Sequence, residues 1–415
     1  MAEQFIRNTL FSELLSRRNG GVFLVWLCLF FVAMGLVRGG KLIVLFDVLF
    51  ALPAIYLLLA RKLKSLRADR WLGGLLVSYL VFVAASGFWS ESAQVDFLRL
   101  NVRMCGYYLI YAVIVVYAAS HYAETRFGVE GATTPSKHTA GLLYFLIVAG
   151  VASAVASMIA WYGFDHIGPR LNFLGSARHP IMGVHYYALP LFCAVTLLFC
   201  GKQFRFFASF IVLFFLMLIV LTGSRGPLGA ALVVIAVRLA VRYRWLFAVG
   251  VVCVGAFAVV LLLAPDWREL IGVRGMSWRP YIWQCALNRI PEALWLGHGS
   301  DGHNYVCSKM FDEKLVPWHA HNIWLSHLYW GGIAGASLLL SVVGRTVYLL
   351  WSNRRYAIAQ VALMQVAFGY IALMVDGNTL VTKPGPMWIT FLLPASVALA
   401  VSYWDKRERA LAVSR

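Results

Sequence analysis

The chain has 415 residues, of which 61% are hydrophobic and only 13% are charged, and its mean hydropathy is +0.75. A soluble globular domain carries about 25% charged residues, so this composition excludes a soluble enzyme, a disordered chain and a disulfide scaffold, and it indicates an integral membrane protein. The net charge of +18 is expected to set membrane orientation, and no nucleic-acid partner is expected.

The N-terminal residues 1–20 alternate apolar and charged side chains at helical spacing, which predicts a helix lying on the membrane surface. The first apolar segment follows, and no small-residue cleavage site comes after it. We therefore expect a retained transmembrane helix rather than a signal peptide.

Apolar windows of transmembrane length recur along the rest of the chain. A spanning helix needs about 20 mainly apolar residues, and twelve such segments are predicted. Most contain no charge, so helices rather than barrel strands should cross the membrane. Their cores lie near Val22–Val37, Leu42–Ala60, Trp71–Trp89, Met104–Ala119, Ala140–Trp161, Ile181–Cys200, Phe206–Thr222, Gly226–Ala240, Trp245–Ala264, Asn322–Val343, Tyr356–Val375 and Met387–Trp404.

These segments predict an all-α, polytopic membrane protein of about twelve transmembrane helices. Its parts are an interfacial segment (1–20), transmembrane helices 1–9 (21–264), a long outward loop carrying short helices (265–319), transmembrane helices 10–12 (320–404) and a tail (405–415). With the N-terminus inside, most of the 36 Lys and Arg residues fall in inner loops. Because cytoplasmic loops are enriched in Lys and Arg, both termini are predicted to be cytoplasmic.

The remaining basic residues face outward and need a reason to do so. Either they bind an anionic substrate, or they pair with the acidic residues of the same region, since ion pairs are common. Many of them are in the outward loop or at outer helix ends: Arg268, Arg274, Arg279, Arg289, Lys309, Lys314, Arg99, Arg103, Arg170, Arg178 and Arg225.

The outward loop is too long for a simple connection, and long loops in compact proteins are usually functional. Proline at position 280 predicts a helix that starts near Ser277–Pro280 and runs to about Ile290. The aromatic residues of the loop suit a lid at the headgroup level. Cys285 and Cys307 are the cysteines outside predicted spans, and a disulfide between them is a further expectation.

Residues 297–302 (Gly-His-Gly-Ser-Asp-Gly) match a dinucleotide-binding fingerprint, but that fingerprint requires a strand before it and a helix after it. A flexible turn between membrane helices is the better interpretation. No Asp-x-Asp metal motif and no zinc-type His/Cys spacing occurs in the sequence, so no metal or other cofactor is expected.

The strongest local motif is His321-Asn322, followed after nine residues by Gly332-Ile333-Ala334-Gly335. His321 falls at the outer mouth of the tenth span, where the positive end of the following helix favours a neutral ring that can accept a proton. A structural histidine is the alternative. Asn322 either orients the histidine or caps the helix. His303-Asn304 lacks the pattern, because Lys314 stands where the glycine would be.

The second motif is Leu221–Pro227, whose glycines and proline break the chain at an outer membrane boundary. Arg225 is presented at this break. Exposed helix amides together with a guanidinium form a suitable anion site. The alternative is a plain turn with an arginine that reaches toward the headgroups.

Together, Ser224-Arg225-Gly226, Arg279 with Trp283, Leu296–Gly299 and the His321 motif resemble the O-antigen ligase family, which shares a signature region with O-antigen polymerases. The resemblance implies a metal-independent, inverting glycosyltransferase of the GT-C type. Such an enzyme moves O-antigen polysaccharide from undecaprenyl pyrophosphate to a core sugar of lipid A–core. The reaction takes place at the periplasmic face of the bacterial inner membrane and completes lipopolysaccharide.

The resemblance also implies roles for individual residues. His321 would be the catalytic residue, and Arg225 and Arg279 would bind the donor pyrophosphate. Supporting roles are expected among Arg289, Arg170, Arg178, Asp376, Asn322 and His303.

Three other functions fit the same sequence features. An O-antigen polymerase would use the same donor with a second lipid-linked glycan as acceptor, and a related ligase would use a protein acceptor. A transporter of lipid-linked sugars would bind phosphate without chemistry, but transporters usually show internal repeats and polar groups at mid-membrane. No repeat is evident in this sequence.

Overall fold

The computed structural model describes residues 20–59, 68–90, 95–125, 137–164, 170–243, 279–300 and 319–413. Within these ranges every regular element is helical, and none is a strand. The predicted all-α class is therefore confirmed for this part of the chain. The main helices are α3 (Gly20–Leu36), α4 (Gly39–Phe46), α5 (Leu52–Leu59), α6 (Arg70–Ser86), α7 (Val95–Thr125), α8 (Lys137–Gly163), α9 (Pro180–Cys200), α10 (Lys202–Leu221), α11 (Arg225–Arg242), α14 (Arg279–Arg289), α15 (Ile323–Ser352), α16 (Ala357–Leu373) and α17 (Leu393–Val413).

Seven described segments are long and apolar enough to cross a membrane, and each overlaps a predicted span. They are Arg70–Trp89, Leu98–Ala118, Thr139–Gly163, Pro180–Cys200, Gln203–Leu221, Ile323–Ser352 and Trp388–Ala410. Two further apolar helices, Trp26–Leu36 and Ala357–Leu373, are shorter and also coincide with predicted cores.

The three other predicted spans do not coincide with a single long apolar helix among the described residues. A π-helical turn, Asp47–Ala51, lies between α4 and α5, so the predicted span Leu42–Ala60 is three helical pieces. The predicted core Gly226–Ala240 is the middle of α11 but is not among the seven apolar segments. The ninth predicted span, Trp245–Ala264, falls outside the described residues, as do residues 1–19 and most of the outward loop.

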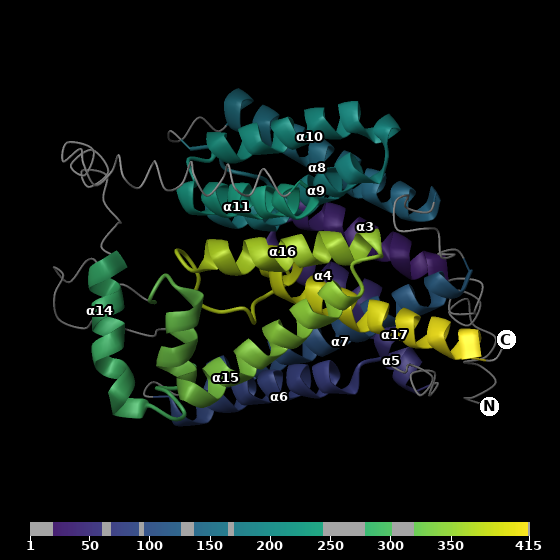
Figure 1. Cartoon of the computed structure of the whole chain (residues 1–415). Coiled ribbons are helices and arrows are strands. Elements are labelled where there is room, and N and C mark those ends of the chain that lie inside the picture. Colours follow the sequence, from purple (N-terminus) through teal and green to yellow (C-terminus); the bar gives the residue numbers. More distant parts are fainter. Residues whose placement is uncertain are drawn as a thin grey trace.

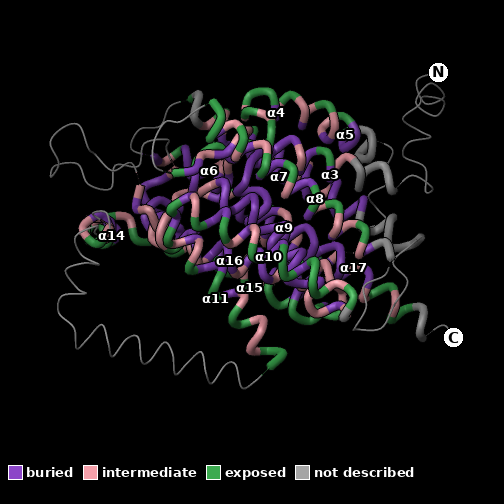
Figure 2. Tube along the Cα trace, turned by 90° about the horizontal axis from the view of Figure 1, so that it is seen from above, coloured by how far each residue is buried: buried purple, intermediate pink, exposed green. Residues whose placement is uncertain are grey.

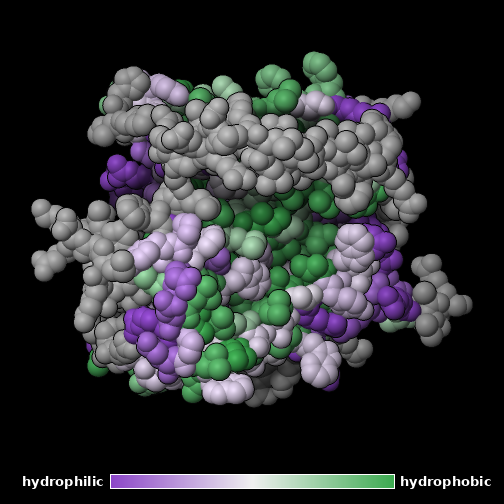
Figure 3. Space-filling model, turned by 60° about the vertical axis from the view of Figure 1, so that its left-hand side comes forward, coloured by the Kyte–Doolittle hydropathy of each residue, from purple (hydrophilic) through white to green (hydrophobic). Residues whose placement is uncertain are grey.

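The long helices lie side by side, and α14 crosses one end of the bundle at a steep angle (Figure 1). Buried residues occupy the interior and exposed residues the rim (Figure 2). In Figure 3, hydrophobic residues gather across the middle of the visible face, with hydrophilic residues toward its two sides. Both views fit a bundle whose sides face lipid and whose ends face water.

The core of the bundle is built around α9 and α17. In each, 83% of the apolar window is buried inside the protein, whereas in α10 the share is 28%. Because α10 is mainly exposed and strongly apolar, its outer face suits contact with lipid. The two central helices therefore hold the bundle together, and α10 lies at its edge.

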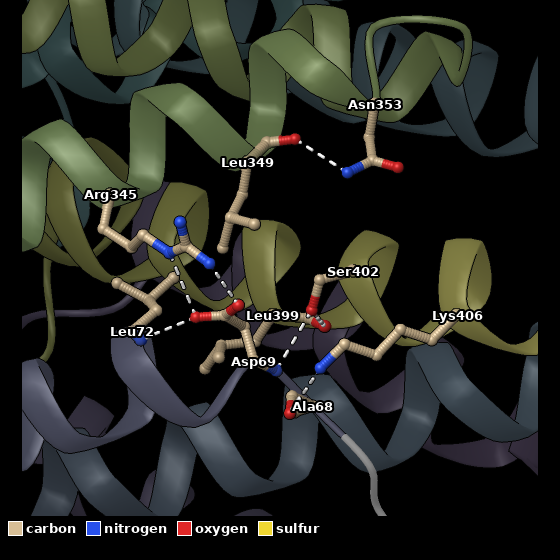
Figure 4. A network of polar contacts seen from close by, with 9 residues as sticks. All are labelled: Ala68, Asp69, Leu72, Arg345, Leu349, Asn353, Leu399, Ser402 and Lys406. Atoms are coloured by element: carbon tan, nitrogen blue, oxygen red, sulfur yellow. Dashed lines mark hydrogen bonds and ion pairs between the residues drawn. The ribbon is translucent and has the colours of Figure 1, made fainter.

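At the end opposite α14, an ion pair joins three helices (Figure 4). Arg345 of α15 donates from Nη2 and Nε to the Asp69 carboxylate, at 2.6 and 3.2 Å. The same carboxylate accepts from the Leu72 amide and caps α6, and the Asp69 amide donates to Ser402 of α17. Burial raises the pKa of Asp69, but the hydrogen bonds from Arg345 and Leu72 outweigh burial and lower it.

Near α14, the chain from Leu294 to Gly299 packs backbone to backbone against a kink in α15. The amides of His298 and Gly299 donate to the carbonyls of Tyr329 and Trp330, at 3.0 and 2.9 Å. At the kink, Gly332 has φ +60°, and a Cβ there would lie 2.5 Å from the Trp295 carbonyl carbon. Gly297–Gly299 are buried, so this segment is a fixed strap, and the interpretation as a flexible turn is wrong for these residues.

Gly331 and Gly335 of the same helix have the G-x-x-x-G spacing, and both lie against α6. A Cβ at Gly335 would approach the Phe82 ring to 2.7 Å, and one at Gly331 would approach it to 3.3 Å. The small residues thus permit close packing of two membrane helices, as the G-x-x-x-G spacing predicts.

We expect Gly332→Ala to lower the stability of the protein by at least about 1 kcal/mol, because it combines a left-handed φ with a collision against backbone. The measurement is the midpoint of thermal unfolding in detergent. Gly344→Ala in the same helix is the matched control, since a Cβ there meets nothing within 4 Å and alanine favours the helix by about 0.5–1 kcal/mol. A Gly332→Ala midpoint equal to that of the control would contradict this account of the strap.

Candidate active site

A cavity of about 210 Å³ lies at the end of the bundle that α14 crosses. Three arginines and one aspartate line it, and they come from four separate parts of the chain. The lining residues are Arg170, Ile181, Gly223, Ser224, Arg225, Gly226, Pro227, Arg279, Val375 and Asp376. The cavity therefore combines cationic side chains, a helix start and one carboxylate.

The turn between α10 and α11 forms one wall, and it is the chain break predicted at 221–227. Gly223 has φ +62°, and the Ser224 amide donates to the Thr222 hydroxyl at 3.2 Å. A Cβ at Gly226 would lie 2.4 Å from the Val375 side chain, so only glycine allows this approach. The turn leaves Arg225 exposed at the first position of α11, where the helix dipole favours an anion.

Arg170 is fixed against the same turn. Its Nε donates to the Thr222 carbonyl at 2.8 Å, and its Nη2 donates to the Ser224 hydroxyl at 3.2 Å. The neighbouring Leu171 amide donates to the Leu221 carbonyl. Arg170, expected in a supporting role, is thus a second guanidinium held in place at this cavity.

Arg279 begins α14, as the predicted helix start near Ser277–Pro280 requires. The helix ends at Arg289 and passes into a short 3₁₀ turn, Ile290–Ala293, at the predicted stop. The Trp283 indole of α14 donates to the Ala320 carbonyl at 2.9 Å. This bond fixes the helix that carries Arg279 to the chain just before His321.

His321 and Asp376 are joined by a hydrogen bond of 2.7 Å between Nδ1 and Oδ1. Burial raises the pKa of Asp376, but the hydrogen bond from His321 and the charges of His321 and Arg279 outweigh burial and lower it. Asp376 is therefore an ionised acceptor, and the proton of the pair lies on His321 Nδ1. In the neutral ring, Nε2 is then free to accept a proton.

The backbone at His321 is in an unusual conformation, with φ +49°. A non-glycine residue in this region stores strain of about 1–3 kcal/mol, and such residues cluster at functional sites. Immediately after it, Asn322 caps α15, since its Oδ1 accepts from the amides of Trp324 and Leu325 at 3.0 and 3.1 Å. Of the two roles considered for Asn322, helix capping is the one that these contacts support.

His319 is a residue of this site that sequence reasoning missed. Its Nδ1 accepts from the His321 amide at 3.0 Å, and the two ring centroids are 3.9 Å apart. Burial and the charge of His321 lower the pKa of His319 to about 4, against the opposing effect of Asp376. His319 is thus neutral near pH 7 and shapes the turn at His321. The His-x-His spacing was its signal in the sequence.

Four residues expected in supporting roles do not line this cavity, and His321 is joined to it through its hydrogen bond with the lining residue Asp376. Asn322 is instead the cap of α15. Arg289 is at the far end of α14, where it donates to the Tyr329 hydroxyl at 2.6 Å and pairs with Glu292. Arg178 lines a different cavity. His303 lies outside the described residues.

The predictions about a disulfide and about metal sites can be compared with the structure only for the described residues. Cys285 is disulfide-bonded, while its predicted partner Cys307 is not among the described residues. Within the described ranges, no three His, Cys, Asp or Glu side chains gather in a way that could hold a metal ion.

Comparison with known proteins adds two findings. The sequence model of the O-antigen ligase family matches residues 210–340, a range that includes Arg225, Arg279 and His321. A curated O-antigen ligase of Pseudomonas aeruginosa is 29% identical over 266 residues, which are 62% of this chain and 62% of that protein. The chain thus spans about three fifths of the length of this curated relative, and the predicted resemblance to the family is confirmed.

The lowered pKa of Asp376 gives a pH-dependent stability prediction. A depressed carboxyl pKa stabilises the fold above the unfolded value of about 4, and this contribution is lost as the pH falls through the folded pKa. We expect Asp376→Asn to lower stability by about 1–1.5 kcal/mol at pH 7, the difference between a charged and a neutral hydrogen bond. The deficit should shrink as the pH falls through the folded pKa of Asp376.

The measurement is again the thermal midpoint in detergent, taken from pH 2 to pH 8. Glu292→Gln is the matched control, because the Glu292 side chain is 58% exposed and exposed pairs contribute little. A deficit of the same size at every pH would show that Asp376 acts through packing and not through its charge.

Proposed function

We propose that this protein is an O-antigen ligase, which transfers O-antigen polysaccharide from undecaprenyl pyrophosphate to the outer-core sugar of lipid A–core. The transfer takes place at the periplasmic face of the inner membrane and completes lipopolysaccharide. The observation that carries the proposal is the gathering of Arg170, Arg225 and Arg279 at one cavity with Asp376, which holds His321. The family match over 210–340 supports it.

His321 acts as the general base in this reaction. The acceptor hydroxyl must lose its proton as it attacks the anomeric carbon, and a positioned base contributes roughly 10²–10⁴-fold. Asp376 accepts from Nδ1 and so leaves Nε2 free for that proton. The carboxylate also stabilises the imidazolium that forms, as in the base–orienter pairs of hydrolases.

The arginines take the place of a metal ion at the leaving group. A diphosphate gains negative charge as the glycosidic bond breaks, and preorganised guanidinium groups stabilise charge that develops in the transition state. The planar fork of arginine matches two phosphate oxygens at once. The diphosphate is already a good leaving group, so the periplasmic reaction needs no nucleotide. Attack from the face opposite the diphosphate inverts the anomeric configuration.

The finer architecture belongs to the same proposal. In this proposal the chain is a GT-C enzyme with twelve transmembrane helices. It consists of an interfacial segment (1–20), transmembrane helices 1–9 (21–264), a periplasmic lid (265–319), transmembrane helices 10–12 (320–404) and a tail (405–415). In this orientation the α14 end of the bundle is periplasmic and both termini are cytoplasmic. The ion pair of Asp69 and Arg345 at the other end then lies on the side where loops are enriched in Lys and Arg.

The first test is a reconstituted reaction. Purified protein, lipid-linked O-antigen and rough lipopolysaccharide, with no metal or nucleotide, should give O-antigen attached to lipid A–core. Growth of the lipid-linked glycan alone would indicate a polymerase. Attachment of the glycan to added protein would indicate a protein ligase. Movement of the lipid-linked sugar across a vesicle membrane without transfer would indicate a transporter. His321→Ala should lower transfer by at least about 10²-fold in protein that still inserts and folds. Near-normal transfer by His321→Ala would remove the base role.

The second test compares arginines at the two ends of the bundle. Arg225→Ala and Arg279→Ala should each lower turnover by about 10²–10³-fold, the usual cost of removing one donor to developing charge. Arg354→Ala is the control, because Arg354 packs on Trp351 beyond the other end of α15. Steady-state kinetics with varied donor measure the effect. Equal losses in all three variants would exclude a diphosphate site at the cavity.

A further inference from the structure

A second cavity, of about 110 Å³, lies beside the connection between α8 and α9 and shares no lining residue with the first. Both helices are candidate spans, so this connection lies at the membrane boundary, at the level of lipid headgroups. Arg178, Asn172 and Trp161 line the cavity. The space is smaller than an engineered cavity of about 150 Å³ that holds one benzene, so it suits one small headgroup and not a glycan chain.

The chemistry of the wall favours an anion. Arg178 is exposed and brings five N–H donors, and Asn172 and Trp161 bring an amide and an indole. The nearby Ser157 hydroxyl already accepts from the Leu174 amide at 3.1 Å. The cavity has no carboxylate among its lining residues. A phosphate group fits this donor-rich, cationic lining better than a neutral sugar does.

The loop that carries Arg178 is held rigidly. The Phe173 amide donates to the Arg178 carbonyl at 3.1 Å and closes the turn. The Ser176 hydroxyl donates to the Met34 carbonyl of α3 at 2.7 Å. Gly175 has φ +68°, and a Cβ there would lie 2.7 Å from the Gly35 backbone. A fixed loop has little backbone entropy left to lose when a ligand binds, so the entropy cost falls on the Arg178 side chain.

The same connection joins the two cavities. Arg170 stands at its first described residue and Arg178 stands eight residues later. Residues 170–173 extend at most about 11 Å, and the turn closed at Phe173 and Arg178 adds about 5.5 Å. The two arginine Cα atoms are thus at most about 17 Å apart. One glycolipid can present its acceptor sugar at the first cavity and a phosphate at the second.

A structural alternative is that Arg178 only neutralises the negative end of α8. The last turn of α8 ends at Gly163, close to Ala160 and Trp161 of the cavity wall. Among the residues that the structure describes, however, no hydrogen bond or ion pair engages the Arg178 guanidinium. Its donors therefore remain available to a ligand within this part of the chain.

We infer that Arg178, with Asn172 and Trp161, binds a phosphate monoester of the acceptor glycolipid, while the cavity of Arg170, Arg225 and Arg279 takes the donor diphosphate. This inference rests on the proposed function, and it divides the outward arginines between the two substrates.

The test is transfer kinetics in nanodiscs of zwitterionic lipid, with intact acceptor and with acceptor whose phosphate monoesters have been removed. Arg178→Ala should raise the KM for intact acceptor about tenfold and leave the donor KM and kcat unchanged. On dephosphorylated acceptor, wild type and variant should be equal. Arg178→Lys should recover part of the loss, because it keeps the charge without the planar fork. Lys383→Ala, which removes an exposed charge in the loop that follows Asp376, should behave as wild type.

Three results would overturn the assignment. An unchanged acceptor KM in Arg178→Ala would leave the second cavity without a role in acceptor binding. A loss that persists on dephosphorylated acceptor would assign Arg178 to structure. A loss that is absent in zwitterionic nanodiscs and appears in a parallel set of nanodiscs with anionic phospholipid would make the cavity a phospholipid site.

A separate binding measurement distinguishes failure of this inference from failure of the proposed function. Binding of intact and dephosphorylated lipid A–core to wild type and Arg178→Ala is measured without donor. If wild type transfers nothing but binds the intact acceptor about tenfold more tightly than the variant does, the proposed function fails and the phosphate site stands. If transfer occurs and binding is equal, the function stands and the inference fails.

Discussion

The contact between His321 and Asp376 is the interaction on which the site depends. It joins residues 55 positions apart in the sequence, one before α15 and the other after α16. The carboxylate has a lowered pKa, so it fixes the proton of the neutral imidazole on Nδ1. The other nitrogen, Nε2, is then the one that can accept a proton. Without this contact, the ring at the mouth of α15 would have no defined tautomer, and the arginines nearby would form only an anion site.

Two close contacts hold the segments that carry His321 and Asp376 in place. Val375 fits against Gly226 with no room for a side chain, and this contact brings Asp376 to the turn that presents Arg225. On the other side, the Trp283 indole holds α14 to Ala320. The site is therefore assembled from helix ends whose relative positions are set by glycines and one indole, and not by the long helices themselves.

The sequence predicts the parts of this site whose signals are local. Glycine and proline mark the break at 221–227, a proline marks the start of α14, and Asn322 marks the cap of α15. The pairing of His321 with Asp376 could not be derived in the same way, since nothing local to either residue encodes how α15 packs against α16. The family resemblance alone suggested Asp376.

Outward arginines also look alike in a sequence, so the sequence does not distinguish Arg178 and Arg289 from Arg225 and Arg279. Only the packing of the folded chain shows which of these arginines line the first cavity. Arg289 is held by the Tyr329 hydroxyl at the far end of an 11-residue helix, about 15 Å from its start. The π-helical turn at Asp47–Ala51 was equally hidden, because a local change of helix type leaves the hydropathy of the segment almost unchanged.

The charge balance of the first cavity favours a multiply charged anion. Three arginines and one aspartate line the cavity, and the carboxylate of that aspartate already accepts a hydrogen bond from His321. Asp376 therefore offsets only part of the positive charge of the arginines, and the start of α11 adds partial positive charge of its own. Like charges held together at a partly desolvated site repel one another, so a multiply charged anion relieves a cost already present in the fold. The same excess is consistent with the division of roles that we propose, in which the carboxylate serves the base and the arginines serve the leaving group.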